Sequence, residues 1–480
     1  MTEPDWRVWL RIGLLGFGGP AGQIGLLHRE TVAQRRWVDE DTFGHALALT
    51  SLLPGPEAHQ TATYVGWLRG GLRSALTAAA LFVAPGAVIT ALLAGAYLQL
   101  GSVGAVGGFF TGLQAAAVAL IVLALSGMAR RVLTSSTAWA LAVGTFLLTT
   151  VTVVPYPAIA VVLAGAGWLS VRARPPGPPP GPPPGPPPGP PPGPPLGPPL
   201  GPPLGPPPGP PLGPPLGPPL GPPLGPPPGP PASSPSDAAP TAPAGISAEL
   251  RRRTILCGLS LIGIVLLGSV LLMAFAGGTV RALTGTLLIS AFTFGGAYAI
   301  LDFATAQLVE RQGLLTAADM ATGLGLAEST PGPLILVLEF ASFIALASGA
   351  GQLWWLLGGL GALLAVAILF IAATGIVLVA APYADALRSS PRMRRALRAV
   401  AASVVGVLAS LALVLIASVC FTDAATVREG PLQFTVPDLR TVDWGVVVIA
   451  LLAGVGLATR RPLWLIAIGC GVIGAVLTLG

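Results

Sequence analysis

Long uncharged apolar stretches dominate the chain, and short segments bearing arginines separate them. Residues 74–129, 132–171, 254–280 and 340–384 contain no Asp, Glu, Lys or Arg. A helix needs about 20 apolar residues to cross a bilayer, so each stretch has room for one or two spans. The pattern therefore predicts an all-α polytopic membrane protein.

The composition supports this class. Hydrophobic residues make up 53% of the chain and charged residues 9%, whereas soluble domains contain about 25% charged residues. We expect full transmembrane helices at the following positions: 74–99, 104–129, 136–153, 157–171, 254–277, 354–380, 398–421, 443–459 and 462–479.

Two short motifs interrupt the apolar sequence, and each motif occurs twice. Phe17-Gly18-Gly19 returns as Phe294-Gly295-Gly296, and Pro54-Gly55-Pro56 returns as Pro331-Gly332-Pro333, in both cases 277 residues later. Gly and Pro break helices, and a bilayer tolerates a broken helix only where protein or a water-filled cavity covers the freed backbone. Interrupted segments at corresponding positions of two halves indicate the binding site of a transporter.

The distribution of arginine predicts how the two halves lie in the membrane. The arginines between residues 7 and 73 can share one side only if each broken segment turns back as a re-entrant hairpin, with arms of about 10–14 residues. The positive-inside rule makes that side cytoplasmic. The span at 254–277 then places the second pair of hairpins on the opposite side. We therefore expect two inverted repeats, each with two re-entrant broken-helix hairpins plus full transmembrane helices. In the alternative, each broken segment crosses once as a kinked helix.

A low-complexity segment separates the two halves. Residues 175–231 repeat Gly-Pro-Pro followed by Pro or Leu, with glycine at every fourth position. Collagen needs glycine at every third position, so we expect a polyproline-II spacer instead. The chain divides into an N-terminal repeat (1–174), a Pro/Gly-rich disordered linker (175–248) and a C-terminal repeat (249–480).

The broken helices carry the expected chemistry. A helix that begins inside the membrane exposes unpaired N–H groups and about half a positive charge, which is an anion site without a cationic side chain. Glycine lets an oxyanion approach the backbone closely. We expect substrate contacts at the motif glycines and prolines: Gly18, Gly19, Pro54, Gly55, Pro56, Gly295, Gly296, Pro331, Gly332 and Pro333. Each half supplies a pair of helix breaks. Two such pairs around one cavity at the middle of the membrane suit a small, multiply charged oxyanion.

Three charged residues are candidates for coupling and recruitment. Glu57 would begin the half-helix after Pro54-Gly55-Pro56. An ionised Glu57 carboxylate occupies the positive field at the helix start, where an anion would bind, whereas a protonated Glu57 carboxyl does not. In the alternative, Glu57 only complements the helix dipole. Glu328 is the second proton-coupling candidate, because buried acids in membrane segments are functional candidates. Arg29 either recruits anions at the cytoplasmic mouth or forms an interfacial ion pair with Glu30. We expect no cofactor and no metal, because the 3 histidines are too scattered for a metal site.

At these motifs the chain resembles the chromate transporter family. The resemblance is carried by Gly16-Phe17-Gly18-Gly19-Pro20, Arg35-Arg36-Trp37-Val38, Leu53-Pro54-Gly55-Pro56-Glu57-Ala58, Thr293-Phe294-Gly295-Gly296-Ala297-Tyr298-Ala299 and Thr330-Pro331-Gly332-Pro333-Leu334. It covers both halves, as in the long two-domain form of the family. The resemblance implies gradient-driven export of chromate across the bacterial inner membrane, and hence chromate resistance.

We expect a secondary transporter rather than an enzyme, because the spans contain no nucleophile–base pair and no metal set. Its expected partners are chromate or sulfate, which share shape and charge, together with protons and the lipid bilayer. Nucleic acid is not expected, and a homodimer is left open. The alternatives are a transporter of sulfate or another small oxyanion, and a membrane scaffold or sensor that uses its proline-rich linker.

Overall fold

The computed structural model describes residues 4–101, 103–152, 154–170, 248–384, 390–422, 424–429, 432–459, 461 and 463–479. The predicted linker at 175–231 lies outside these residues. The first half consists of α1 (Asp5–Leu15), α2 (Gly19–His28), the π-helix η1 (Arg29–Gln34), α3 (Glu40–Thr50), α4 (Glu57–Leu100), α5 (Gly104–Val132), α6 (Ser136–Val151) and α7 (Tyr156–Leu169).

The second half has more, and shorter, helical segments. It consists of α8 (Ala248–Phe275), α9 (Gly278–Ala291), α10 (Gly296–Thr305), the π-helix η2 (Ala306–Arg311), α11 (Ala317–Ser329), η3 (Leu334–Leu336), α12 (Val337–Ala347), η4 (Gly351–Leu353), α13 (Trp354–Val366), η5 (Ala367–Ile371), α14 (Ala372–Ala380), η6 (Ala381–Tyr383), α16 (Pro391–Cys420), η7 (Leu439–Thr441), α17 (Trp444–Ala458) and α18 (Leu463–Leu477).

All four motifs interrupt helices, as their Gly and Pro content predicts. Gly18 and Gly295 precede α2 and α10 with φ of 87° and 107°, in the left-handed region that favours glycine. Pro56 and Pro333 stand immediately before α4 and η3 in extended conformation. Each motif therefore ends one helical piece and starts another.

A further break divides α4 into two antiparallel arms. Gly70 and Gly71 leave the helical conformation, with φ of −151° and 66°. The arms lie side by side, because a carbon built on Gly66 would be 2.8 Å from the Cβ of Ala78. The second arm agrees with the span expected at 74–99, and the first is the short arm expected before it.

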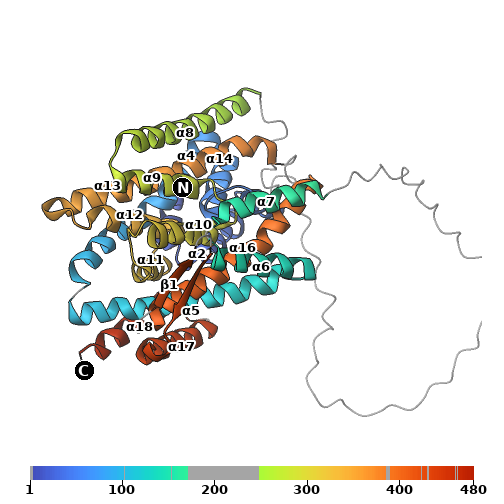
Figure 1. The fold of residues 1–480 in the computed structure, drawn as a ribbon. Helices are drawn as coiled ribbons and strands as arrows, with labels where there is room; N and C mark the ends of the chain where they lie inside the picture. The colour runs from blue at the N-terminus through green and yellow to red at the C-terminus, as the bar shows by residue number, and fades with distance from the viewer. Residues whose placement is uncertain are drawn as a thin grey trace, which may run out of the picture. The chain divides into compact units, whose positions relative to one another are not determined.

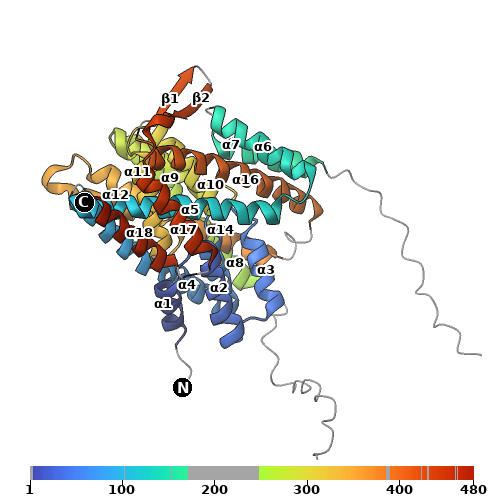
Figure 2. The ribbon, with the colours of Figure 1, turned by 90° about the horizontal axis from the view of Figure 1, so that it is seen from below.

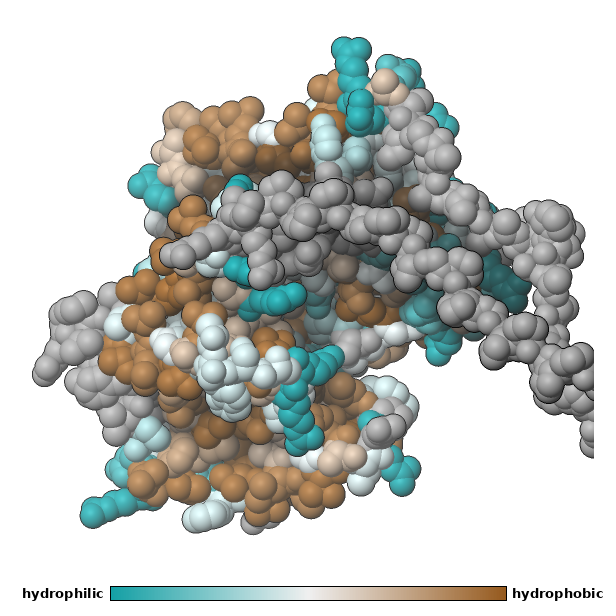
Figure 3. Space-filling view, turned by 90° about the vertical axis from the view of Figure 1, so that its right-hand side faces the viewer, coloured by the Kyte–Doolittle hydropathy of each residue, from teal (hydrophilic) through white to brown (hydrophobic). Residues whose placement is uncertain are grey.

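Apolar helices cover the outside of the molecule. Five described segments are long and apolar enough to cross a membrane: Glu57–Leu100, Gly104–Val132, Ala248–Phe275, Gly351–Tyr383 and Arg395–Cys420. Large apolar side chains remain exposed on them and on the shorter helices, for example Leu267 at 63% and Leu451 at 66%. Figure 3 shows one such face, with broad hydrophobic areas and smaller hydrophilic clusters. Lipid is the natural solvent of such a surface.

The two halves pack against each other, as Figures 1 and 2 show from two directions. α16 of the second half lies against α5, α6 and α7 of the first, and α17 and α18 pack on α5. α12 packs on α4, and α11 packs on α5. The segment Leu334–Phe340 is buried throughout. The core is therefore shared between the halves.

One element departs from the expected all-α fold. β1 (Ala424–Glu429) and β2 (Leu432–Pro437) pair antiparallel, with Ala424 opposite Pro437. The hairpin projects from the helices in Figure 2. It occupies the connection between α16 and α17, where Thr, Val and Phe favour extended structure.

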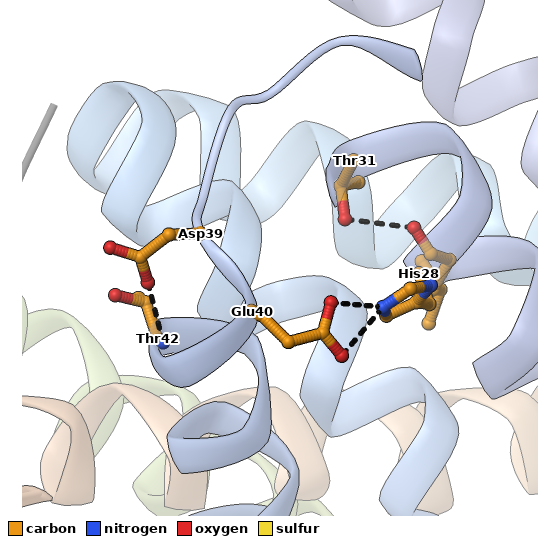
Figure 4. Close-up of polar contacts among 6 residues, drawn as sticks. His28, Thr31, Asp39, Glu40 and Thr42 are labelled. Atoms are coloured by element: carbon orange, nitrogen blue, oxygen red, sulfur yellow. Dashed lines mark hydrogen bonds and ion pairs between the residues drawn. The ribbon is translucent and has the colours of Figure 1, made fainter. Parts of the chain in front are cut away.

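Polar contacts fix the turn between η1 and α3, as Figure 4 shows. His28 Nε2 lies 2.8 Å from Glu40 Oε2. Asp39 caps α3, accepting a hydrogen bond of 2.7 Å from the backbone N–H of Thr42. Hydrogen bonds from the side chain and the backbone of Thr42 lower the pKa of the Asp39 carboxyl.

Candidate functional site

A partly open cavity lies beside three of the four helix breaks, those at Gly18, Gly55 and Gly295. Two adjoining pockets of about 370 Å³ and 200 Å³ share Glu57, Met128, Gly295 and Gly296 in their walls. We call the two pockets together the central cavity. Its walls come from the starts of α2, α4 and α10, the ends of α3, α5 and α11, and one side of α16.

The amino ends of α2 and α10 both reach the central cavity. Gly18 lies in its wall at the start of α2, and Gly295 and Gly296 lie there at the start of α10. No heavy atom lies within 4 Å of the point where a side chain on Gly296 would begin. The first N–H groups of α10 have no acceptor within their own helix. Open space beside these unpaired N–H groups is what an anion site requires.

Reciprocal hydrogen bonds join the helix breaks of the two halves. The N–H of Gly55 donates to the carbonyl of Thr293 at 3.3 Å, and the N–H of Gly332 donates to the carbonyl of Gly16 at 3.1 Å. Each Pro-Gly-Pro loop is thus held by the Gly-Gly loop of the other half, through corresponding positions. The Gln23 side chain also donates to the carbonyl of Gly332. This pairing fixes the four breaks relative to one another.

Charged side chains of both signs line the central cavity. Glu57 begins α4 and accepts a hydrogen bond of 3.3 Å from the Ser51 hydroxyl. Arg131, near the end of α5, lines the same pocket as Glu57 and Glu328. A guanidinium keeps its charge and presents several donors, so it can bind an oxyanion directly.

Glu328 lies directly beside the amino end of α2. Its side chain is buried, with 2% of the residue exposed. A carbon built on Gly19 would be 2.6 Å from Glu328 Oε2 and 3.0 Å from Oε1. The Tyr298 hydroxyl donates to Oε1 at 3.3 Å. The carboxylate thus lies at the amino end of α2, where the helix dipole favours negative charge.

The structure brings part of the predicted site together. Six of the predicted residues line the central cavity: Gly18, Gly55, Glu57, Gly295, Gly296 and Glu328. Gly19 is buried beneath Glu328. Pro54 and Pro56 flank Gly55 but are not among the lining residues.

Pro331, Gly332 and Pro333 lie away from the central cavity. All three are buried, and a carbon built on Gly86 of α4 would be 2.8 Å from the Cα of Gly332. Their contact with substrate stays a prediction. Arg29 is exposed on η1, outside the lining of the cavity. Its neighbour Glu30 pairs with Arg35, and recruitment of anions by Arg29 also stays a prediction.

Two lining residues escaped the sequence analysis. Arg131 follows a long uncharged span and was not among the predicted site residues. Tyr298 stands two residues after Gly296, and that proximity was the available signal. Both residues enter the cavity through helix packing between the halves. Among the described residues, no three His, Cys, Asp or Glu side chains are grouped to hold a metal ion.

The long apolar helices with exposed apolar side chains define a multi-pass membrane protein. Comparison with known families specifies which kind. The sequence matches the Chromate transporter family over residues 6–169 and 280–475. The chain therefore belongs to this family, a family of transporters rather than enzymes.

Individual relatives match over shorter stretches. The chromate transport protein of Pseudomonas aeruginosa is 38% identical over 136 residues, which is 28% of this chain and 33% of the relative. The chromate transport protein of Cupriavidus metallidurans is 34% identical over 113 residues, 24% of this chain and 28% of the relative. The uncharacterized transporter YwrB of Bacillus subtilis is 40% identical over 76 residues, 16% of this chain and 39% of the relative. These matches span about a third of the relatives' length. No solved structure matches the chain.

Proposed function

We propose that this protein is a secondary transporter that carries a small oxyanion, chromate first, through the central cavity. The observation that carries the proposal is the convergence of three positive elements on one cavity: the amino end of α2, the amino end of α10, and Arg131. Backbone N–H groups and a guanidinium suit the oxygens of a tetrahedral dianion. Relatives named chromate transport proteins support this substrate.

Binding of protons and binding of the oxyanion favour each other through the carboxylates of the cavity. Glu328 lies against the amino end of α2, and Glu57 lies in the wall of both pockets. An ionised carboxylate repels a dianion in a site with little water, whereas a protonated one does not. Binding of the oxyanion therefore favours protonation, and protonation favours binding of the oxyanion.

Export from the bacterial cytoplasm suits the charge of the substrate. Moving one elementary charge across 100 mV is worth about 2.3 kcal/mol, so an inside-negative potential drives outward, with about 4.6 kcal/mol per 100 mV, a dianion whose coupled protons do not cross with it. That energy supports a concentration ratio of about 10³. We place the protein in the inner membrane, where this potential exists, and chromate resistance follows from export.

The two halves (1–174 and 249–480, joined by 175–248) form inverted repeats in this proposal. Breaks at corresponding positions support it, and so do the reciprocal bonds from Gly55 to Thr293 and from Gly332 to Gly16. A transporter built this way alternates access by moving one repeat against the other around a fixed site.

Sulfate is the second candidate substrate, because backbone N–H groups and one arginine recognise charge and tetrahedral shape. Counterflow in proteoliposomes separates the two. Vesicles loaded with chromate should accumulate labelled chromate, and excess sulfate should reduce the uptake only if both anions share the site.

The decisive experiment measures flux of labelled chromate and labelled sulfate by purified protein in vesicles of known orientation. We expect saturable chromate flux that responds to membrane potential. Matched vesicles that contain an Arg131→Gln variant of normal thermal stability should show a reduced affinity for chromate. Absence of saturable flux for any small oxyanion would overturn the proposal.

A further inference from the structure

We propose that a second pocket of the molecule captures and releases the hydrated oxyanion at the end of the pathway away from Arg131. This pocket, about 380 Å³, lies between α9, the far end of α10 with η2, and the turn joining α6 to α7. We call it the α9–α10 vestibule. The inference rests on the proposed function, because it assigns a second station to the same substrate.

The vestibule is basic, and none of its lining residues is acidic. Arg281 comes from the first turns of α9, and Arg311 is the last residue of η2. Thr286, Gln307 and Gln312 supply the uncharged polar groups of the wall. The central cavity, in contrast, contains two carboxylates beside its arginine. The charged residues that line the vestibule are thus of one sign, which favours an anion there.

One continuous helical segment links the two sites. Gly296 and Ala297 at the start of α10 line the central cavity, whereas Phe303, Gln307 and Arg311 line the vestibule. Residues 296–311 rise about 24 Å at 1.5 Å per residue. The central cavity and the two arginines of the vestibule therefore lie at opposite ends of one helical segment.

The chain also places the vestibule far from Arg131. Arg131 precedes α6, whereas Pro155 and Pro157, which line the vestibule, follow it. α6 contains 16 residues, which corresponds to about 24 Å. The pathway thus has an arginine near one end and two arginines near the other, with the helix breaks between them.

The size of the vestibule indicates how it binds. A pocket of about 380 Å³ holds about a dozen waters at roughly 30 Å³ each, so a tetrahedral oxyanion keeps much of its hydration shell there. Binding is then weak and electrostatic, and its main effect is to raise the local anion concentration. Such an effect falls with ionic strength.

The test uses Arg281→Gln, Arg311→Gln and the double variant in proteoliposomes whose two orientations are assayed separately. The matched control is Arg440→Gln, which removes an exposed arginine in η7 outside the vestibule lining. From the vestibule side, we expect the double variant to raise the KM for chromate about ten-fold and to flatten its salt dependence. The KM from the other side should stay unchanged. Arg281→Glu should raise the vestibule-side KM further.

The outcomes separate the vestibule from the proposed function. If the unmodified protein transports chromate and the double variant keeps its KM and salt dependence from both sides, the vestibule assignment is wrong. Equal changes from both sides also contradict it. If the unmodified protein shows no saturable flux, the proposed function itself fails. Thermal unfolding of each variant shows whether the fold is intact, and the single variants provide the test if the double variant is unstable.

Discussion

Gly296 is the residue where backbone conformation and proposed binding are most closely tied. Its φ is 75°, in the region that favours glycine, and the space beside it is open to the central cavity. A side chain would therefore project towards the place where the oxyanion is proposed to bind.

Gly296→Ala should weaken oxyanion binding at least ten-fold while the fold persists. The methyl group meets no atom within 4 Å, so the penalty to stability is only the strained backbone, about 1–2 kcal/mol. Gly313→Ala is the matched control, because Gly313 has φ of 60° and equally open surroundings but lies outside the cavity lining. Ligand-dependent thermal shifts with chromate and sulfate measure the effect. Equal anion affinities in both variants would contradict a site at α10.

Glu328→Gln should make oxyanion affinity less dependent on pH. The ionised carboxylate opposes the anion at the amino end of α2, so affinity in the unmodified protein should rise as pH falls. The amide keeps the shape and remains an acceptor for Tyr298 but cannot ionise. Anion binding measured between pH 5.5 and 8.5 checks this.

Two comparisons sharpen the Glu328 test. Glu339→Gln alters another buried carboxyl, 3% exposed and outside the cavity lining, and should leave the pH dependence intact. Glu57→Gln should also reduce the dependence, since Glu57 lines both pockets. An unchanged pH profile in both Glu57→Gln and Glu328→Gln would eliminate coupling through these carboxylates.

At the scale of the helices, the sequence predicted the breaks better than the contacts between them. Gly and Pro act locally, so the interruptions before α2, α4, α10 and η3 could be placed from the motifs alone. For Tyr298 the only local signal is its place two residues after Gly296, whereas the position of Arg131 depends on how α5 packs, which no local signal encodes. The burial of Pro331–Pro333 has the same origin, since α4 of the other half covers this loop.

Gly86→Ala should destabilise the protein through one of these contacts between helices. A carbon at Gly86 would lie 2.8 Å from both the Cα of Gly332 and Leu336 Cδ1, so α4 or the loop must shift, at about 1–3 kcal/mol. Gly263→Ala in α8 has no neighbour within 4 Å and should be neutral or slightly stabilising, because alanine favours helix. Thermal unfolding in detergent compares the two, and a stable Gly86→Ala variant would argue against the close approach.

At the scale of the whole molecule, the two halves form one compact unit. One folded unit contains Met1–Val171 and Ala239–Gly480. Its central cavity takes α2, α4 and α5 from the first half and α10, α11 and α16 from the second. Neither half forms the whole cavity alone. We therefore expect the connecting segment to contribute to transport mainly by holding the two halves in one chain.

Deletion of residues 175–231 should therefore leave oxyanion transport within about two-fold of the full chain. The remaining connection, residues 171–174 and 232–247, can still extend about 60 Å, and the contacts between halves lie outside the deleted segment. Chromate flux in vesicles and thermal unfolding should be measured together on the shortened protein. The scaffold alternative makes the opposite forecast, because a protein that acts by recruiting a partner through its prolines loses its function with them. A shortened protein of normal stability that has lost its flux would favour that alternative. A shortened protein of reduced stability would show that the deletion disturbs the packing of the two halves against each other.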